Sequence, residues 1–279
     1  MESLGREAAS DAALEAERQF VLTLGGYALE VPGATLVTHE KLPVPRFNFV
    51  QATGVGPERQ TAFFERALDH YFQRALRPTF RVAPPVPDHL DAGLRRFGFR
   101  PREGSLALLL ADAPLGAGPA EGVAVRPART PEIELLASFW SNERERPELR
   151  SALDLAWNHP NPTERLVPLL AEVGGAPVAS ALVYRYRTTA GIHAVATRRE
   201  ARGQGAASAL VHYAIEHGTA GPGVRYSMFT DSPRLETRLG ALGFHVVRRF
   251  VEYELPPEAV LALPTPGPPG APRWRPPRA

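Results

Sequence analysis

The segment Arg202-Gly203-Gln204-Gly205-Ala206-Ala207-Ser208 has the residue types of a phosphate-binding loop. Gly203 and Gly205 let the backbone approach an anion closely, and the small side chains after Gly205 leave the start of a helix open. The first turn of a helix offers N–H groups and a partial positive charge to a phosphate. Arg202 adds a full positive charge. The segment therefore predicts an anion site that needs no metal, with a tight strand-to-helix turn as the alternative that two glycines alone leave open.

Three short apolar runs precede this loop, and an amphipathic helix follows it. The runs cover residues 166–173, 178–186 and 192–197, with a hairpin turn at 174–177. Over 206–217 the apolar residues have the spacing of a helix with one buried face: Ala207, Leu210, Val211, Ala214 and Ile215. A dinucleotide-binding loop would need a βαβ setting and a third glycine, where this chain has Ser208. The antiparallel meander therefore argues against that alternative.

The remaining predicted elements form two similar halves. Leu-x-x-apolar-Gly-Phe occurs at 94–99 and again at 239–244, each time between a predicted helix and a predicted strand, which indicates a duplicated module. The second half also has predicted strands at 123–126, 225–229 and 245–255, and predicted helices at 131–142, 147–157 and 233–242. The first half has predicted strands at 20–24, 27–31, 34–37, 47–51 and 105–110, and predicted helices at 57–74 and 88–97.

Stretches rich in Pro and Gly set the expected domain boundaries. We predict an N-terminal domain at 1–113, a linker at 114–122, a second domain at 123–256 and a Pro-rich tail at 257–279. Where the second half has its glycine loop, the first half has residues 53–58, which also hold glycines. There Pro57 removes a backbone donor and Glu58 places a negative charge where a phosphate would lie. The first half is therefore not expected to bind an anion.

The composition narrows the class of protein. With 44% hydrophobic and 22% charged residues among 279, the chain can bury a sizeable core. The absence of cysteine excludes disulfides, thiolate metal sites and a cysteine nucleophile. A net charge of +2 from interspersed cations and anions argues against nucleic-acid binding. No signal peptide or membrane-spanning run is apparent, so we expect a cytoplasmic protein that does not bind a membrane.

From Val123 to Leu255 the chain resembles the GNAT acetyltransferase superfamily. The signature Gln/Arg-x-x-Gly-x-Gly/Ala is matched by Arg202, Gly205 and Ala207, and Leu242-Gly243-Phe244 follows a helix and a strand later. The resemblance implies an α+β fold of two GNAT-like modules, each a mixed, mostly antiparallel central sheet flanked by helices. The N-terminal module resembles a degenerate copy, as in tandem GNAT proteins, so the resemblance implies one CoA per chain.

The resemblance assigns the cofactor contacts residue by residue. The backbone from Arg202 through Gly203, Gln204, Gly205, Ala206 and Ala207 to Ser208 would hold the pyrophosphate of acetyl-CoA or another acyl-CoA, with no metal. Val195, Ala196 and Thr197 would pair with pantetheine in β-fashion, and Ser232 would contact the same arm where the family often has Asn. One departure stands out: the family's usual Tyr, the acid for the leaving thiolate, is replaced by Leu239.

Two side chains are candidates for acid–base chemistry. His193 has a suitable pKa for a general base, and strict alternation along its strand would place it on one face with Val195 and Thr197. Glu143 lies where GNAT proteins often line the acceptor site. The expected reaction is transfer of an acetyl group to a primary amine of a small molecule, amino acid or peptide. The amine attacks directly in a ternary complex. A homodimer is compatible with this reaction. The alternative is a catalytically silent acyl-CoA-binding or sensing protein.

Overall fold

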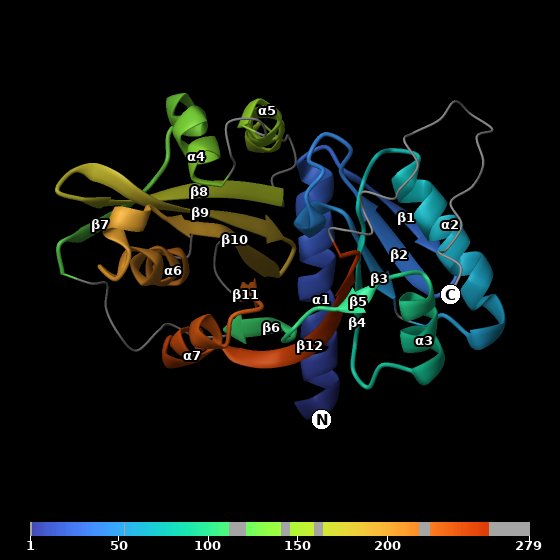
Figure 1. Ribbon diagram of the computed structural model, residues 1–279. Helices are drawn as coiled ribbons and strands as arrows, with labels where there is room; N and C mark the ends of the chain where they lie inside the picture. The colour runs from blue at the N-terminus through green and yellow to red at the C-terminus, as the bar shows by residue number, and fades with distance from the viewer. Residues whose placement is uncertain are drawn as a thin grey trace. The chain divides into compact units, whose positions relative to one another are not determined.

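The computed structural model describes residues 2–52, 54–111, 121–140, 146–158, 164–217 and 224–256 (Figure 1). The chain divides into two compact units that do not follow chain order. Unit 1 comprises Met1–Gly25 and Ala107–Arg248, and unit 2 comprises Gly26–Leu106 and Arg249–Ala279. Each unit therefore contains a segment from the other half of the sequence. Most of the predicted linker and the whole predicted tail lie outside the described residues.

Unit 1 is built on a mixed sheet with the strand order β6-β11-β10-β9-β8-β7. Neighbouring strands are antiparallel except β10 and β11, which are parallel. The bounds are β6 (Leu106–Ala111), β7 (Val123–Pro127), β8 (Glu164–Val173), β9 (Ala176–Tyr186), β10 (Thr189–Thr197) and β11 (Arg225–Thr230). The predicted meander and the mixed, mostly antiparallel sheet are thus confirmed.

Helices cover both faces of this sheet. They are α1 (Glu2–Thr23), α4 (Ile133–Trp140), α5 (Arg146–Trp157), α6 (Ala206–Glu216) and α7 (Pro233–Ala241), with short 3-10 turns η3 (Thr130–Glu132) and η4 (Arg199–Ala201). Figure 1 shows α4 and α5 on one side of β7 to β10 and α6 on the other. The apolar face of α6 packs on alternate sheet residues to form one buried cluster, which includes Leu169, Val183, Ile192, Leu210 and Val211. Burial of this stripe is what makes the segment helical and places its N-terminus beside β10.

The first helix corrects the sequence interpretation. Residues 20–24 were predicted as a strand because Phe-Val-Leu-Thr-Leu is apolar with a β-branched pair. In the structure Phe20 to Thr23 form the last turn of α1, and Leu24 follows the helix. Phe20, Val21 and Leu24 are buried, because α1 packs against β9 and β10. Tertiary packing of one helix face therefore outweighs the local strand preference.

Unit 2 is built on a second sheet, in which β12 is contributed from the far end of the chain. Its strand order is β1-β2-β3-β4-β12, and β5 also pairs with β12. The bounds are β1 (Tyr27–Val31), β2 (Ala34–Thr38), β3 (Phe49–Ala52), β4 (Thr79–Val82), β5 (Arg100–Pro101) and β12 (His245–Glu254); the helices are α2 (Gln60–Phe72) and α3 (Asp88–Arg96), and the 3-10 turns are η1 (Pro45–Phe47) and η2 (Pro57–Arg59). The aromatic core of this unit includes Phe63, Phe64, Tyr71, Phe80 and Phe99.

Two terminal strands are exchanged between the halves of the sequence. Residues 107–111 of β6, from the first half, pair with β11 in unit 1. Val251–Tyr253 of β12, from the second half, pair with Phe80–Val82 of β4 in unit 2. A buried ion pair also links β4 and β12, with Arg81 Nε 3.0 Å from Glu252 Oε1. Each unit is therefore completed by a strand that the other half encodes.

No described helix has the length and apolar character required to cross a membrane.

Candidate active site

The glycine loop has the backbone conformation that its composition predicts. After β10 the chain makes the 3-10 turn η4 and enters the loop, where Gly203 has φ +87° and Gly205 φ +81°. Gly205 is the N-cap of α6 in the left-handed region, which a residue with a Cβ adopts only at a cost. Arg202, Gly203 and Gln204 are exposed. The loop therefore presents its backbone to solvent at the start of a helix.

Five N–H groups around the helix start are available to a ligand. Over the described part of the chain, the backbone N–H groups of Gly203, Gly205, Ala206, Ala207 and Ser208 have no protein acceptor, whereas Gln204 N–H donates to Ala201 O at 3.4 Å. The Arg202 side chain stays beside the loop, with Nε 3.5 Å from Thr197 O. Convergent N–H groups, a helix N-terminus and a nearby guanidinium suit a pyrophosphate.

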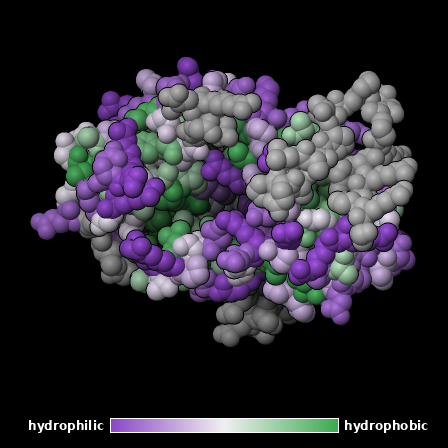
Figure 2. Space-filling model, in the orientation of Figure 1, coloured by the Kyte–Doolittle hydropathy of each residue, from purple (hydrophilic) through white to green (hydrophobic). Residues whose placement is uncertain are grey.

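The strand that leads into this loop separates from its neighbour. β10 and β11 pair at only three positions, from Thr189↔Arg225 to Gly191↔Ser227. Beyond them β10 runs on to Thr197 beside β9, and β11 runs on to Thr230 beside β6. The two strands therefore form a fork whose vertex is the Gly191–Ser227 pair and whose open end lies toward the loop. Figure 2 shows hydrophobic surface in a hollow of unit 1 over this region.

A β-bulge in β10 corrects the predicted placement of His193. The pairing with β9 shifts between His193↔Leu182 and Ala196↔Ser180, and Ala194 has φ +51°. Because the bulge inserts a residue, the faces no longer alternate strictly. Val195 packs against the cluster under α6. His193 lies on the opposite face, so it does not share a face with Val195 and Thr197.

His193 is held at the vertex of the fork. Its imidazole folds back along β10 over Gly191, where a Cβ would come within 2.1 Å of Nε2. Phe20 of α1 stacks on the imidazole with ring centroids 4.1 Å apart and planes 9° apart. Glycine at 191 therefore leaves the space that the imidazole occupies. The other acid–base candidate, Glu143, lies outside the described residues.

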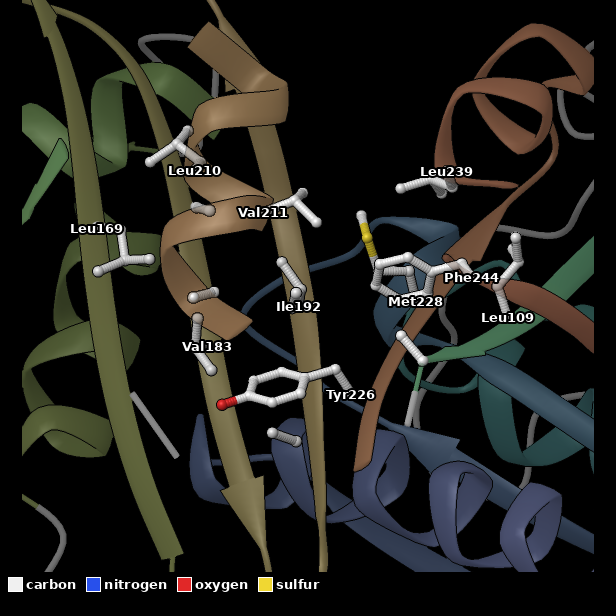
Figure 3. Close-up of a cluster of buried hydrophobic side chains, with 14 of the residues drawn as sticks. Leu109, Leu169, Val183, Ile192, Leu210, Val211, Tyr226, Met228, Leu239 and Phe244 are labelled. Carbon is white, nitrogen blue, oxygen red and sulfur yellow. The ribbon is translucent and has the colours of Figure 1, made fainter. Parts of the chain in front are cut away.

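The two remaining residues singled out in the sequence belong to α7, Ser232 as its N-cap and Leu239 within the helix. Ser232 caps this helix, since its hydroxyl oxygen accepts a hydrogen bond from Leu235 N–H at 3.3 Å, and its O–H remains able to donate. Leu239 is only 1% exposed and belongs to the cluster with Val211 and Met228. Figure 3 shows the Leu239 and Val211 side chains pointing toward each other within that cluster. Leu239 therefore fills core space and supplies no proton.

The corresponding loop in unit 2 is closed by its own residues. β3 and β4 stay paired from Phe49↔Thr79 to Ala52↔Val82, so the strands do not separate. Gly54 N–H donates to Gly33 O at 3.0 Å in the β1–β2 turn. The Glu58 carboxylate lies over Gly56, where a Cβ would meet Oε1 at 2.6 Å. Both features that define the site in unit 1 are thus absent from the described part of unit 2.

Sequence reasoning missed the residues that α1 brings to the vertex. Thr23 Oγ1 lies 2.8 Å from the Tyr184 hydroxyl of β9, and Phe20 contacts the Tyr184 and His193 rings. Helical spacing of Ala13, Phe20 and Leu24 was the available signal, but Glu17 interrupts it on the same buried face. No cluster of three or more His, Cys, Asp or Glu side chains suited to a metal occurs among the described residues.

Comparisons with known proteins agree with this geometry. Residues 132–245 match the model of the Acetyltransferase (GNAT) family. A GCN5-related N-acetyltransferase from Kribbella flavida has a TM-score of 0.65 and 18% identity, over 91% of this chain and 98% of that one. A tandem GNAT protein from the clavulanic acid biosynthesis pathway has a TM-score of 0.54 and 15% identity, over 80% of this chain and 79% of that one. A search of curated proteins found no match.

These structural similarities extend over both halves and show a shared fold. The family match covers the forked strands, the glycine loop and α7, where the site geometry was found. Residues 132–245 of this chain therefore resemble the GNAT acetyltransferase family in sequence, and the chain as a whole shares the fold of GNAT structures.

Proposed function

We propose that this protein is an acyl-CoA-dependent N-acyltransferase that moves an acetyl group to a primary amine. The observation that carries the proposal is the β10–β11 fork, which leads from a vertex at Gly191 and Ser227 to the unpaired N–H groups that begin at Gly203. An extended ligand with an anionic end fits this arrangement, because one strand edge and one helix N-terminus lie in line.

The chain's own groups have separate tasks in binding. The N–H groups from Gly203 to Ser208 would hold the pyrophosphate. β10 and β11 pair only up to Gly191, so the edge of β10 at Val195, Ala196 and Thr197 would pair with the pantetheine arm. Ser232 O–H would donate to the same arm. The six steps along the strand from Gly191 to Thr197 span about 20 Å at roughly 3.3 Å per residue. The acyl end of the ligand would therefore come close to the vertex, where His193 lies.

The reaction then needs proton transfer and polarisation of the acyl carbonyl. A backbone N–H in the bulged part of β10 would donate to the acyl oxygen as charge develops there. His193 would take a proton from the attacking ammonium, directly or through water. Leu239 cannot protonate the departing thiolate, so solvent would do so, which an easily leaving thiolate tolerates.

The test is release of free CoA from acetyl-CoA in the presence of a panel of primary amines. We expect release that depends on the amine, together with formation of its N-acetyl derivative by mass spectrometry. If the protein binds CoA but none of the amines increases the release of free CoA, the proposal is contradicted. That result would favour the second candidate, a silent acyl-CoA-binding protein, for which Leu239 in place of an acid is the supporting observation.

One CoA is expected to bind per chain. Unit 1 has the forked strands and available N–H groups, whereas the paired β3–β4 strands and the Glu58 carboxylate close the equivalent place in unit 2. Isothermal titration with CoA measures the stoichiometry directly. A value near two would mean that unit 2 opens to ligand.

Replacing Leu239 by Tyr is expected to destabilise the protein without restoring the acid. At 1% exposure the side chain has no room for a larger ring, and overpacking costs about 1–3 kcal/mol. Urea denaturation of Leu239→Tyr measures this loss. The control is Leu235→Tyr on the same helix, because Leu235 is 37% exposed and should tolerate the change. A turnover rate that rises tenfold or more in Leu239→Tyr would show instead that the phenol reaches the reacting sulfur.

A further inference from the structure

Three locally unfavourable features of β10 surround one side chain, that of His193. Gly191 lies inside the strand, where a glycine packs no side chain and loses more conformational freedom than other residues. Ala194 has φ +51°, a left-handed conformation that costs energy in a residue with a Cβ. The bulge between His193 and Ala196 interrupts the pairing with β9. Because such costs gather where function requires a particular geometry, the orientation of the His193 imidazole calls for a functional explanation.

The imidazole, and not the backbone, explains the glycine at position 191. Unlike Gly203 and Gly205, Gly191 does not have a positive φ, so its backbone conformation is open to other residues. A Cβ at this position would lie 2.1 Å from Nε2, 2.7 Å from Cε1 and 3.0 Å from Cδ2 of His193. These distances are too short, since carbon atoms in contact lie about 3.5–4.0 Å apart. Any side chain at 191 would therefore displace the imidazole.

The helix α1 fixes the plane of the same ring. The Phe20 ring lies nearly parallel to the imidazole, at 9° with centroids 4.1 Å apart, and Phe20 is 5% exposed. Phe20 also contacts the Tyr184 ring, with centroids 5.5 Å apart, and the Tyr184 hydroxyl lies 2.8 Å from Thr23 Oγ1 in the next turn of α1. These contacts hold Phe20 against the sheet. The stack and the space over Gly191 together select one orientation of the His193 side chain.

We propose that Phe20 and Gly191 are positioning residues that hold the His193 imidazole at the vertex of the fork, in the orientation from which it takes a proton in the transfer reaction. This inference rests on the proposed function, in which His193 is the base. Phe20 and Gly191 have no side-chain group that transfers a proton, so both act through His193. Phe20 precedes residues 132–245, the part that matches the family model, so the proposal makes α1 a part of the active site.

The position of a base decides how much it contributes to the rate. A side chain accepts a proton only within hydrogen-bond reach, about 2.6–3.2 Å between heavy atoms, and a well-placed base contributes about 10²–10⁴-fold. A displacement of about 1 Å can cost about 10²-fold. An imidazole released from the stack would rotate and leave the vertex for part of the time. Loss of the Phe20 ring should therefore lower kcat. The KM for acetyl-CoA should change little, because the available N–H groups from Gly203 to Ser208 stay in place.

The first measurement is NMR of the full-length protein with bound CoA, in which His193→Gln identifies the signals of His193. In the wild type we expect a nuclear Overhauser effect between the imidazole Hε1 and the Hα protons of Gly191. Phe20→Leu should lose this effect, whereas Phe20→Tyr keeps the aromatic ring and should retain it. The matched control is Leu14→Ala, because Leu14 is 7% exposed on the same helix and its truncation leaves the stack intact. Gly191→Ala should move the imidazole proton resonances downfield, because the imidazole then leaves the shielding face of the Phe20 ring.

The second measurement is a double-mutant cycle on turnover with the best amine of the panel. We expect Phe20→Leu to lower kcat at least about tenfold in the wild-type background. In the His193→Gln background the same change should lower kcat by less than about twofold, because a residue that acts through the imidazole has no further effect once the imidazole is gone. Phe20→Tyr should restore most of kcat, and Leu14→Ala should stay close to the wild type.

The outcomes separate this inference from the proposed function. Equal falls in kcat in both backgrounds, or an unchanged nuclear Overhauser effect in Phe20→Leu, would overturn the positioning role. If the wild type acetylates no amine, the proposed function fails and the NMR measurement decides alone. Loss of the effect in Phe20→Leu with retention in Leu14→Ala then supports positioning of the imidazole, and equal spectra reject it. Thermal melts verify that each variant folds, and Gly191→Ala tests the same orientation without a change in α1.

Discussion

Gly205→Glu is expected to abolish the rise in thermal midpoint that CoA produces in the wild-type protein. At a CoA concentration about 100-fold above Kd, a ligand that binds only the native state stabilises it by about 2.7 kcal/mol. Gly205 is the N-cap of α6, between the available N–H groups of Gly203 and Ala206. A carboxylate placed there repels the pyrophosphate and competes for the same donors. Differential scanning fluorimetry with and without CoA measures the effect.

Gly205→Gln is the matched control for charge. Gly205 has φ +81°, so either side chain strains the backbone and lowers the midpoint of the free protein by a similar amount. Gln retains the bulk of Glu without its charge and should keep a measurable part of the CoA-dependent shift. A full shift in Gly205→Glu would mean that the pyrophosphate binds elsewhere, and the assignment of the loop would be wrong.

Glu252→Gln is expected to lower the free energy of unfolding by about 3–5 kcal/mol, the usual loss when one partner of a buried ion pair is removed. Arg81 and Glu252 are 7% and 9% exposed, so neither charge has much access to water. The Arg81 guanidinium also lies over the Phe49 ring, 3.9 Å from its centroid. Without the carboxylate, this buried guanidinium loses its ion pair with Glu252. Chemical denaturation followed by circular dichroism measures the loss.

The same strand provides the control for this prediction. Glu254 of β12 is exposed, so Glu254→Gln makes the identical change in side chain with an expected effect under about 0.5 kcal/mol. Similar stabilities of the Glu252 and Glu254 variants would show that the Arg81–Glu252 pair contributes little to holding β12 in unit 2.

Local patterns were sufficient to predict most elements of unit 1. The meander and the helix after the loop follow from alternation and helical spacing, both of which act over a few residues. Gly203 and Gly205 have the positive φ values for which glycine is suited. The fold of the second half and the backbone conformation of its glycine loop were therefore accessible from the sequence.

Long-range pairing and one extra residue account for what the sequence could not reveal. The bulge in β10 changes the face of His193 although its neighbours read as a regular strand. The helix α1 was not recognised because Glu17 interrupts its apolar stripe, and a buried carboxylate has no local signature. The partners of β6 and β12 depend on contacts between segments far apart in the chain, which periodicity does not encode.

The exchange of β6 and β12 has a consequence for synthesis on the ribosome. A chain made from its N-terminus releases β1 to β4 early, but β4 receives its β12 partner only after residue 254 has emerged. Unit 2 therefore waits, with one edge of its sheet open, until nearly all of the described chain exists, although its other strands lie in the first half. Cleavage between the two halves of the sequence would yield two fragments that each lack a strand of their unit.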